Sequence, residues 1–388
     1  MTNNKDKKVL NVLNLRFPNF FEEWEEHYLS EYLEFKNGLN PNAEKFGRGI
    51  KFISVMDILS NNVITYDCIR ASVEITAEEL KSFIVKNGDI LFQRSSETLE
   101  DVGRANVYMD DKPAVFGGFV IRGKKKSEYN PLFFKYLLAT PYARRKIIPM
   151  GAGAQHFNIG QEGLSKVKLY FPILQEQHKI ASLLQLIDER ISTQNKIIED
   201  LKKLKSAIYQ ELFSNLQGEK KSLSELAEIT KGQQVNGNQL NENGKYYVMN
   251  GGIMPSGYYD DYNTEAGTIS ISEGGNSCGY VQYNKSKFWS GGHCYTLHIK
   301  PTARISTLFL FHFLKWKEED IMRLRIGSGL PNIQKKDLSK VRIIVPTFDK
   351  QQRLIALLST LQMKIEYEEM YTINLDKQKL HLLSQMFI

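Results

Sequence analysis

The sequence has few cysteines and no long hydrophobic run. Cys68, Cys278 and Cys294 are an odd number of thiols without close spacing, which argues against a disulfide framework and favours a reducing cytoplasm. No apolar run reaches the ~18 residues of a membrane-spanning helix, so no contact with a membrane is predicted. Residues 2–8 are polar and no apolar stretch follows them, which is not the pattern of a secretory signal peptide. We therefore expect a cytoplasmic protein.

Catalytic motifs are also missing. Residues 130–133, Asn-Pro-Leu-Phe, partly match an amino-methyltransferase signature, but they lack its second proline and no glycine-rich cofactor loop precedes them. A helix start explains them, because Asn caps helices and Pro suits the first turn. Gln155 and His156 follow the glycines of 151–154 where a phosphate-binding loop would have Lys and Ser/Thr. His293 lies next to a cysteine without the spacing of metal ligands. The sequence therefore predicts no catalytic residue and no metal site.

Glycine and proline are absent from two long stretches, 173–217 and 347–388. In both, apolar residues follow alternating steps of four and three, which is the heptad seam of a coiled coil. An amphipathic helix lying on a globular core is the alternative interpretation. The apolar seam residues are Ile180, Leu184, Ile187, Ile191, Ile198, Leu201 and Ile208 in the first stretch and Leu354, Leu358, Leu361, Ile365, Leu375 and Leu382 in the second.

A lysine interrupts both seams at the same relative position, as Lys205 and Lys379. If the helices paired in parallel, the two ammonium groups would face each other inside an apolar seam, which is costly. Antiparallel pairing separates them by about 18 residues, or roughly 27 Å of helix. We therefore predict that the two helices pair in antiparallel orientation.

The sequence contains an internal repeat. Residues 158–191 align without a gap with residues 332–365, and 11 of the 34 positions are identical. Such self-similarity indicates a duplicated structural unit. Shorter matches extend the repeat through the globular segments: Leu29-Ser30-Glu31 with Leu223-Ser224-Glu225, Gly88-x-Ile90 with Gly267-x-Ile269, Gly103 with Gly279, and Gly117-Gly118 with Gly291-Gly292.

The globular segments read as strands joined by polar turns. Stretches rich in β-branched and aromatic residues predict strands over 50–55, 89–93, 105–109, 114–121 and 166–171. We expect an α+β fold with two similar domains, at 1–172 and 216–346. Spacer helices at 173–215 and 347–388 are expected to separate them and to form an antiparallel coiled coil with pseudo-twofold symmetry.

The net charge of +7 lies on the globular segments. Residues 173–215 carry six basic and six acidic side chains, and residues 347–388 carry five of each. A basic excess confined to two domains indicates that the domains, and not the helices, meet a polyanion. Ordinary solubility charge is the alternative.

Loops rich in Gly, Asn, Ser and basic residues are the candidate binding surface. Glycine lets the backbone approach a ligand, Arg can bond a guanine edge, and Asn, Gln, Ser and His present base-edge donors and acceptors. A solvated loop is the alternative for any one of them. The candidate DNA-binding residues are Arg94, Ser95, Ser96, Arg104, Lys124, Lys125, Gln155 and His156 in the first domain and Asn250, Tyr258, Glu273, Asn276, Ser277 and His293 in the second.

Two diverged domains separated by two equivalent helices resemble the DNA-specificity subunit of type I restriction–modification systems. The resemblance covers essentially the whole chain, and the two seams and the run Asn-Ile…Leu-Ser-Lys-Val…Pro…Gln…Leu-Leu carry it in both copies. The second domain is similar to that family's target-recognition domains in the order Gly267-Thr268-Ile269, Gly279-Tyr280-Val281 and Phe288-Trp289-Ser290-Gly291-Gly292.

The resemblance implies a non-catalytic subunit in which each domain reads one half of a split, asymmetric target in double-stranded DNA. It implies that the helices set the spacing between the halves and dock two methyltransferase subunits, and that restriction (motor-nuclease) subunits join the complex. S-adenosylmethionine, ATP and magnesium would belong to those partners, and this chain would hold no cofactor. A single-chain modification or restriction enzyme with an unrecognised catalytic motif, and a coiled-coil scaffold without a role on DNA, are the alternatives.

Overall fold

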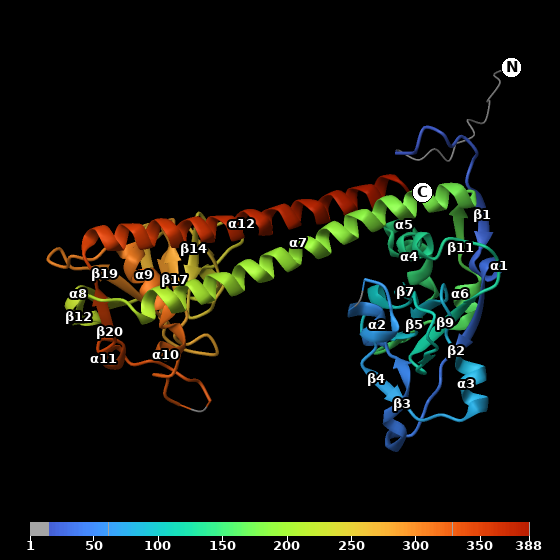
Figure 1. Cartoon of the computed structure of the whole chain (residues 1–388), viewed down its shortest axis with the longest axis horizontal. Helices are drawn as coiled ribbons and strands as arrows, with labels where there is room; N and C mark the ends of the chain where they lie inside the picture. The colour runs from blue at the N-terminus through green and yellow to red at the C-terminus, as the bar shows by residue number, and fades with distance from the viewer. Residues whose placement is uncertain (1–14, 61, 328, 388) are drawn as a thin grey trace. The chain divides into compact units, whose positions relative to one another are not determined.

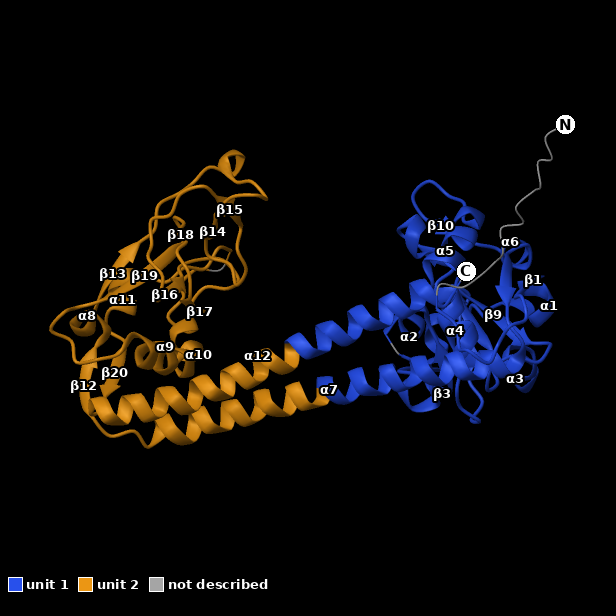
Figure 2. Ribbon diagram, turned by 90° about the horizontal axis from the view of Figure 1, so that it is seen from above, with its two compact units in different colours: residues 1–195, 370–388 blue, residues 196–369 orange. Residues whose placement is uncertain are grey.

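The computed structural model of the chain describes residues 15–60, 62–327 and 329–387, and Figure 1 shows its elements. The polar residues 2–8 lie outside the described part. The chain forms two units, residues 1–195 with 370–388 and residues 196–369 (Figure 2). Two long helices, α7 (Leu174–Ser214) and α12 (Phe348–Gln385), each contribute to both units. Glycine and proline are absent from both helices, as the sequence predicts.

The first unit is built on small sheets. A four-stranded antiparallel sheet has the order β2 (Leu33–Asn37), β9 (Val120–Lys125), β5 (Ile90–Gln93), β7 (Ala105–Val107). A three-stranded sheet has β3 (Phe46–Ile53) between antiparallel β4 (Ala71–Val73) and parallel β8 (Val115–Phe116). Two pairs complete it, β1 (Glu25–Tyr28) with β11 (Lys168–Phe171) and β6 (Ser95–Ser96) with β10 (Phe157–Asn158). Its short helices are α1 (Leu29–Tyr32), α2 (Val55–Ser60), α3 (Ala77–Phe83), α4 (Pro131–Ala139), α5 (Pro141–Ile147) and α6 (Gln161–Ser165).

The second unit repeats the three larger sheets strand for strand. Its four-stranded sheet has the order β13 (Ala227–Lys231), β19 (Cys294–Ile299), β16 (Thr268–Ser272), β17 (Val281–Asn284). Its three-stranded sheet has β14 (Tyr246–Met249) between antiparallel β15 (Gly257–Tyr259) and parallel β18 (Trp289–Ser290). Strand β12 (Glu219–Ser222) pairs with β20 (Arg342–Val345), and the short helices are α8 (Leu223–Leu226), α9 (Thr307–Trp316), α10 (Glu318–Met322) and α11 (Lys335–Leu338). The prediction of one duplicated α+β fold is therefore confirmed.

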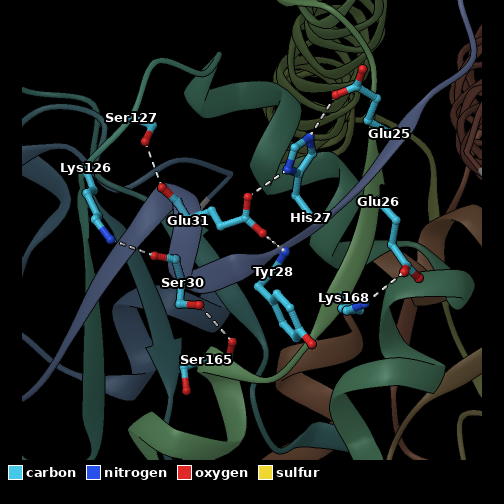
Figure 3. Close-up of polar contacts among 10 residues, drawn as sticks. All are labelled: Glu25, Glu26, His27, Tyr28, Ser30, Glu31, Lys126, Ser127, Ser165 and Lys168. Carbon is cyan, nitrogen blue, oxygen red and sulfur yellow. Dashed lines mark hydrogen bonds and ion pairs between the residues drawn. The ribbon is translucent and has the colours of Figure 1, made fainter.

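Two of the repeated motifs recur because they bind each other. In the first unit Leu29 N donates to Val167 O at 2.9 Å. Ser30 Oγ donates to Ser165 O at 3.1 Å, as Figure 3 shows. The Glu31 carboxylate accepts from Tyr28 N at 2.7 Å, which caps α1. The Leu-Ser-Glu turn therefore docks on the Leu-Ser-Lys-Val segment.

The second unit repeats this docking. Leu223 N donates to Val341 O at 2.9 Å, and Ser224 N donates to Ser339 O at 3.1 Å. Lys300 Nζ donates to Ser224 O at 2.6 Å, and the equivalent Lys126 of the first unit donates to Ser30 O at 3.2 Å (Figure 3).

Each long helix ends with a phenylalanine in a core. Phe213 is fully buried, and its ring lies 5.6 Å from that of Phe313 in α9. Phe387, the equivalent residue two positions beyond the end of α12, is 6% exposed, and its ring lies 5.5 Å from that of Phe133 in α4. Helix α4 starts where the sequence predicts, since Asn130 Oδ1 accepts from Phe133 N at 2.9 Å and Pro131 fills the first turn.

The strand predictions need correction at several ends. The strand expected over 50–55 is β3, which begins earlier and ends at Ile53, and β5 and β7 are shorter than predicted. The strand expected over 114–121 is two strands, β8 and β9, because the chain turns at Gly117–Phe119. Val120 N donates to Gly117 O at 2.8 Å and closes this turn. A run of apolar residues hides the turn from a hydrophobicity pattern, and only the two glycines signal it.

The long helices pair in antiparallel orientation within each unit. In the first unit Asp188 bonds Lys379, and Arg190 bonds Tyr371. Residue numbers therefore fall along α12 as they rise along α7. In the second unit Lys202 with Glu369 and Lys205 with Gln362 follow the same direction. The antiparallel prediction is confirmed.

The predicted seam residues lie at the contact between α7 and α12. The first turns of α7 and α12 also pack on the core of their own unit, so the alternative of a helix lying on a globular core describes those turns. Buried seam residues are Ile180, Leu184, Ile198, Leu354, Leu358, Ile365 and Leu375, and half-buried ones are Ile187, Ile191, Leu201, Ile208, Leu361 and Leu382.

The lysine that interrupts the second seam is neutralised by a buried carboxylate. Lys379 Nζ lies 2.5 Å from Asp188 Oδ1, and Asp188 Oδ2 accepts from the Tyr136 hydroxyl at 2.8 Å and from Lys135 Nζ at 3.3 Å. Burial alone would raise the pKa of the Asp188 carboxyl. The hydrogen bond from Lys379 and the charges of Lys135 and Lys379 outweigh it and lower that pKa from its ordinary value.

The lysine of the first seam has a different partner. Lys205 Nζ donates to Gln362 Oε1 at 2.6 Å, and Gln362 occupies the position in the second helix that Asp188 has in the first. Burial, followed by the charge of Lys315, lowers the pKa of Lys205. A neutral amide therefore replaces the carboxylate in the second unit.

Asp188→Asn should lower the unfolding free energy of the first unit by about 3 kcal/mol at pH 7, because two ammonium groups would remain around a neutral side chain. The pKa of Asp188 is lower in the folded protein than the ordinary Asp value of about 3.9. The stabilisation by its carboxylate is therefore fully present above about pH 3.9, and it is lost as the pH falls through the folded-state pKa. Calorimetric unfolding should therefore show a gap between variant and parent that shrinks from pH 5 to pH 3.

Asp376→Asn is the matched control, since Asp376 is exposed on α12, and it should change stability by less than about 0.5 kcal/mol. Equal effects of the two variants, or a gap that does not depend on pH, would contradict the role of the ion pair.

Candidate nucleic-acid interface

In the first unit several candidate residues meet where β5 ends. Arg94 follows β5; its N–H donates to Phe119 O at 2.8 Å and its Nη1 donates to Gly118 O at 3.2 Å. The Asn40 side chain packs directly against Gly118, where a Cβ would lie 1.8 Å from Asn40 Oδ1. The turn and the strand end are therefore fixed to each other.

An exposed loop, residues 152–158, is attached to the same strand end. Ala152 and Asn158 exchange backbone hydrogen bonds of 2.9 and 2.8 Å, and Asn158 pairs with Ser95. Gly153 has φ +145°, and a Cβ on it would lie 2.0 Å from His156 O. The loop is therefore closed tightly at its base, and its outer residues Gln155 and His156 are exposed. The structure therefore brings the candidates Arg94, Ser95, Ser96, Gln155 and His156 together at this strand end.

Arg104 lies at this end of the sheet and the two lysines do not. Arg104 O accepts from Gln93 N at 2.7 Å, although its guanidinium pairs with Asp101 at 2.6 Å. Lys124 and Lys125 are at the opposite end of β9, where Lys124 pairs with Glu34 at 3.6 Å and Lys125 pairs with Glu128 at 3.1 Å. The structure therefore does not place the lysines beside the other candidates.

The second unit has an equivalent arrangement at the end of β16. Glu273 follows this strand, and its N–H donates to His293 O at 2.9 Å. Gly274 pairs with Asn332, which exchanges hydrogen bonds of 2.9 and 3.0 Å with Ile326. Glu273 and His293 correspond to Arg94 and Phe119 of the first unit. Gly274, Asn332 and Ile326 correspond to Ser95, Asn158 and Ala152.

The side chains of this second site are connected by polar contacts. The Glu273 carboxylate accepts from Lys231 Nζ at 2.7 Å and from the Tyr295 hydroxyl at 3.1 Å, and it lies 3.7 Å from His293 Nδ1. Burial and the Glu273 charge raise the pKa of Tyr295 to about 12, so its hydroxyl remains a donor. Asn250 Oδ1 accepts from His293 N at 3.0 Å.

The remaining candidates of this unit divide into two groups. Asn276 and Ser277 lie on the turn that follows Glu273, and Gly275 N in this turn donates to Pro331 O at 2.9 Å. Tyr258 lies on β15 opposite Tyr247, away from the end of β16. The structure therefore gathers Asn250, Glu273, Asn276, Ser277 and His293, and leaves Tyr258 outside the group.

Sequence reasoning missed three residues of the two sites. Asn158 and Asn332 are in the internal repeat, and their role in closing the loops explains why the motif recurs. Phe119 is the counterpart of His293 in the first unit and was hidden in an apolar run, yet it is 69% exposed. Equivalence to His293 is the signal that could have found it.

Other kinds of site are not evident in the described residues. No group of three or more His, Cys, Asp and Glu side chains there is placed to hold a metal ion. None of the helices described is both long and apolar enough to cross a membrane. A cavity of about 800 Å³ in the second unit lies between α7, α12 and the α9–α10 segment, and none of the candidate residues lines it.

Known proteins share this architecture. The family model described as Type I restriction modification DNA specificity domain matches residues 21–203 and again residues 216–375. A protein named as a type I specificity subunit of Mycoplasma pneumoniae is 35% identical over 157 residues, which are 40% of this chain and 42% of that protein. The alignment with a similarly named Mycoplasma genitalium protein, 32% identical, spans 38% of that protein. The chain thus spans less than half the length of these two relatives.

Longer alignments have lower identity. The MjaVIII type I specificity subunit of Methanocaldococcus jannaschii is 22% identical over 97% of this chain and 94% of that protein. The crystal structure of the type I S subunit from M. genitalium covers 97% of this chain and 99% of its own with a TM-score of 0.64 and 20% identity. A chain from work on complex assembly of the type I R-M system has a TM-score of 0.59, 14% identity and coverage of 93% and 96%. These structures establish a shared fold.

Gly153→Ala should open the loop at 152–158, because the new Cβ meets a backbone oxygen and φ is positive. Such strain costs about 1–3 kcal/mol, so the amides of Ala152 and Asn158 should exchange with solvent about tenfold faster or more. Hydrogen exchange measured by mass spectrometry tests this. Gly160→Ala is the matched control, since a Cβ there meets nothing within 4 Å and φ is −101°. Unchanged exchange in Gly153→Ala would contradict the tight closure.

Proposed function

The chain belongs to the family of type I restriction modification DNA specificity domains, and from this membership we propose that it reads a bipartite, asymmetric DNA target for a type I restriction–modification enzyme. Residues 1–172 and 216–346 are proposed as the two target-recognition domains, and residues 173–215 and 347–388 as the spacer helices. The observation that carries the proposal is that one binding arrangement occurs twice on one scaffold, with different side chains. Because Arg94 and Phe119 in one site correspond to Glu273 and His293 in the other, the two half-sites should differ.

The chemistry of the gathered residues suits base edges. Arg94 can donate to guanine, and Gln155 and Asn250 can pair with adenine, whereas the Glu273 carboxylate is only 12% exposed and is engaged by Lys231 and Tyr295. The placement of the first three on turns and strand ends fixes them for direct contact. Lys124 and Lys125 lie at the other end of their sheet and are proposed for phosphate contact only.

The partners are proposed to bind the long helices. Leu204 in α7 is 50% exposed and Leu357 in α12 is 48% exposed, although neighbouring seam residues are covered. Apolar side chains on a charge-balanced helix favour a helical partner surface, which we assign to two methyltransferase subunits. Restriction subunits would join the complex, and S-adenosylmethionine, ATP and magnesium would be bound by the partners in the cytoplasm.

Reconstitution tests the function. The full chain should co-purify with the methyltransferase subunit of its own system, and this complex should methylate DNA in the presence of S-adenosylmethionine. Sequencing of the methylated positions should give a split motif with two different halves. Methyl transfer by the chain alone would establish the single-chain enzyme instead, and a continuous or palindromic motif would contradict the bipartite proposal.

The helices are also proposed to set the spacer. The heptad steps of the first helix continue from Ile208 to Leu212, so the seam from Ile180 to Leu212 is about 48 Å long at 1.5 Å per residue. This length equals about 14 base pairs of 3.4 Å, which we take as the outer bound for the unread spacer between the two half-sites. One heptad added to both helices in register keeps the seam and lengthens it by about 10 Å. The methylation motif should keep both halves while the spacer grows by up to about three base pairs. An unchanged spacer, or altered halves, would contradict the ruler; one added residue is the control and should abolish assembly.

A further inference from the structure

The two units place a ring side chain at one equivalent position. Phe119 follows Gly117-Gly118 in the first unit, and His293 follows Gly291-Gly292 in the second. Arg94, the first residue after β5, donates its N–H to Phe119 O at 2.8 Å. Glu273, the first residue after β16, donates its N–H to His293 O at 2.9 Å. The backbone around the two rings is therefore the same, and only the side chains differ.

Phe119 is exposed in a segment that is otherwise covered. Every other residue from 114 to 123 is buried, and the Phe119 side chain is 69% exposed. Burying a phenylalanine contributes about 1.5–3 kcal/mol, so the fold gains little stability from this ring. The ring is held on a rigid base, because Gly117 N donates to Ile53 O at 3.0 Å and Gly118 admits Asn40.

The His293 ring is presented in a similar way, beside a carboxylate. It is 63% exposed, and its Nδ1 lies 3.7 Å from Glu273 Oε2, which is longer than a hydrogen bond. Glu273 is itself 12% exposed and is fixed by Lys231 and Tyr295. The exposed ring can therefore carry its proton on Nε2 and offer it to a ligand. The histidine site is therefore polar where the phenylalanine site is apolar.

Within the proposed function, on which this inference rests, we infer that Phe119 and His293 are the equivalent specificity-determining residues of the two domains. The apolar group that base edges present in the major groove is the 5-methyl of thymine, so Phe119 contacts a thymine methyl in the first half-site. Purines present N7 as an acceptor, so His293, in the tautomer that carries its proton on Nε2, donates from Nε2 to a purine N7 in the second half-site.

Base analogues test both contacts on the full chain in complex with its methyltransferase subunits. Each thymine of the first half-site is replaced in turn by uracil, which lacks the methyl group, and binding is measured by fluorescence anisotropy. Replacement at one position should weaken binding by the parent complex about fourfold, the value of one methyl contact. In Phe119→Ala the same replacement should have no effect, while Phe119→Leu should restore part of it.

The second half-site is tested with 7-deazapurines, which lack N7. One such replacement should weaken binding by the parent complex about fivefold, the value of one hydrogen bond, and should have no effect in His293→Ala. Phe21→Ala is the control for loss of an exposed ring, since Phe21 is 85% exposed in the first unit, and it should keep the full sensitivity to uracil.

The outcomes separate this inference from the proposed function. If Phe119→Ala keeps the uracil effect, or weakens binding to all duplexes equally as an intercalating wedge would, the thymine contact is wrong although the split target is still read. If the parent complex recognises no split target, the proposed function itself fails.

Discussion

A lysine in an apolar helix seam must find a polar partner, and this constraint fixes how the two long helices pair. Lys379 meets Asp188 and Lys205 meets Gln362, which requires antiparallel orientation and one register. That register brings the last turn of each helix to the unit in which the other helix begins. Phe213 and Phe387 then enter the cores of those units, so coil pairing and domain packing depend on each other.

The scaffold is conserved between the two units while the sites differ. The Gly-Gly turns and the Asn-closed loops make the same backbone hydrogen bonds in both, and so does the leucine of each Leu-Ser-Glu turn. A hydrogen bond between backbone groups depends on the side chain only where a glycine or a capping residue is needed. The exposed side chains at the other positions can therefore change without loss of the fold. Arg94 with Phe119 and Glu273 with His293 are such changes, and the proposed reading of two unlike half-sites requires differences of this kind.

Much of this architecture can be predicted from sequence, because it follows from periodicity and repetition. The heptad steps, the shared lysine and the internal repeat predict the helices, their orientation and the duplication. The turn at Gly117–Phe119 was missed because its flanks are apolar, and exposure of one ring in a buried run leaves no trace in hydropathy. The separation of Lys124 from Arg94 depends on strand length and direction, which composition does not give.

Exchange of one recognition domain tests the central claim that each domain reads its own half of the target. Residues 216–346 would be replaced by the equivalent domain of a relative with a known motif, and methylated positions would be sequenced for the complex with its methyltransferase. The account predicts that one half of the motif changes to that of the relative while the other half and the spacer stay the same. A change in both halves, or in neither, would contradict it.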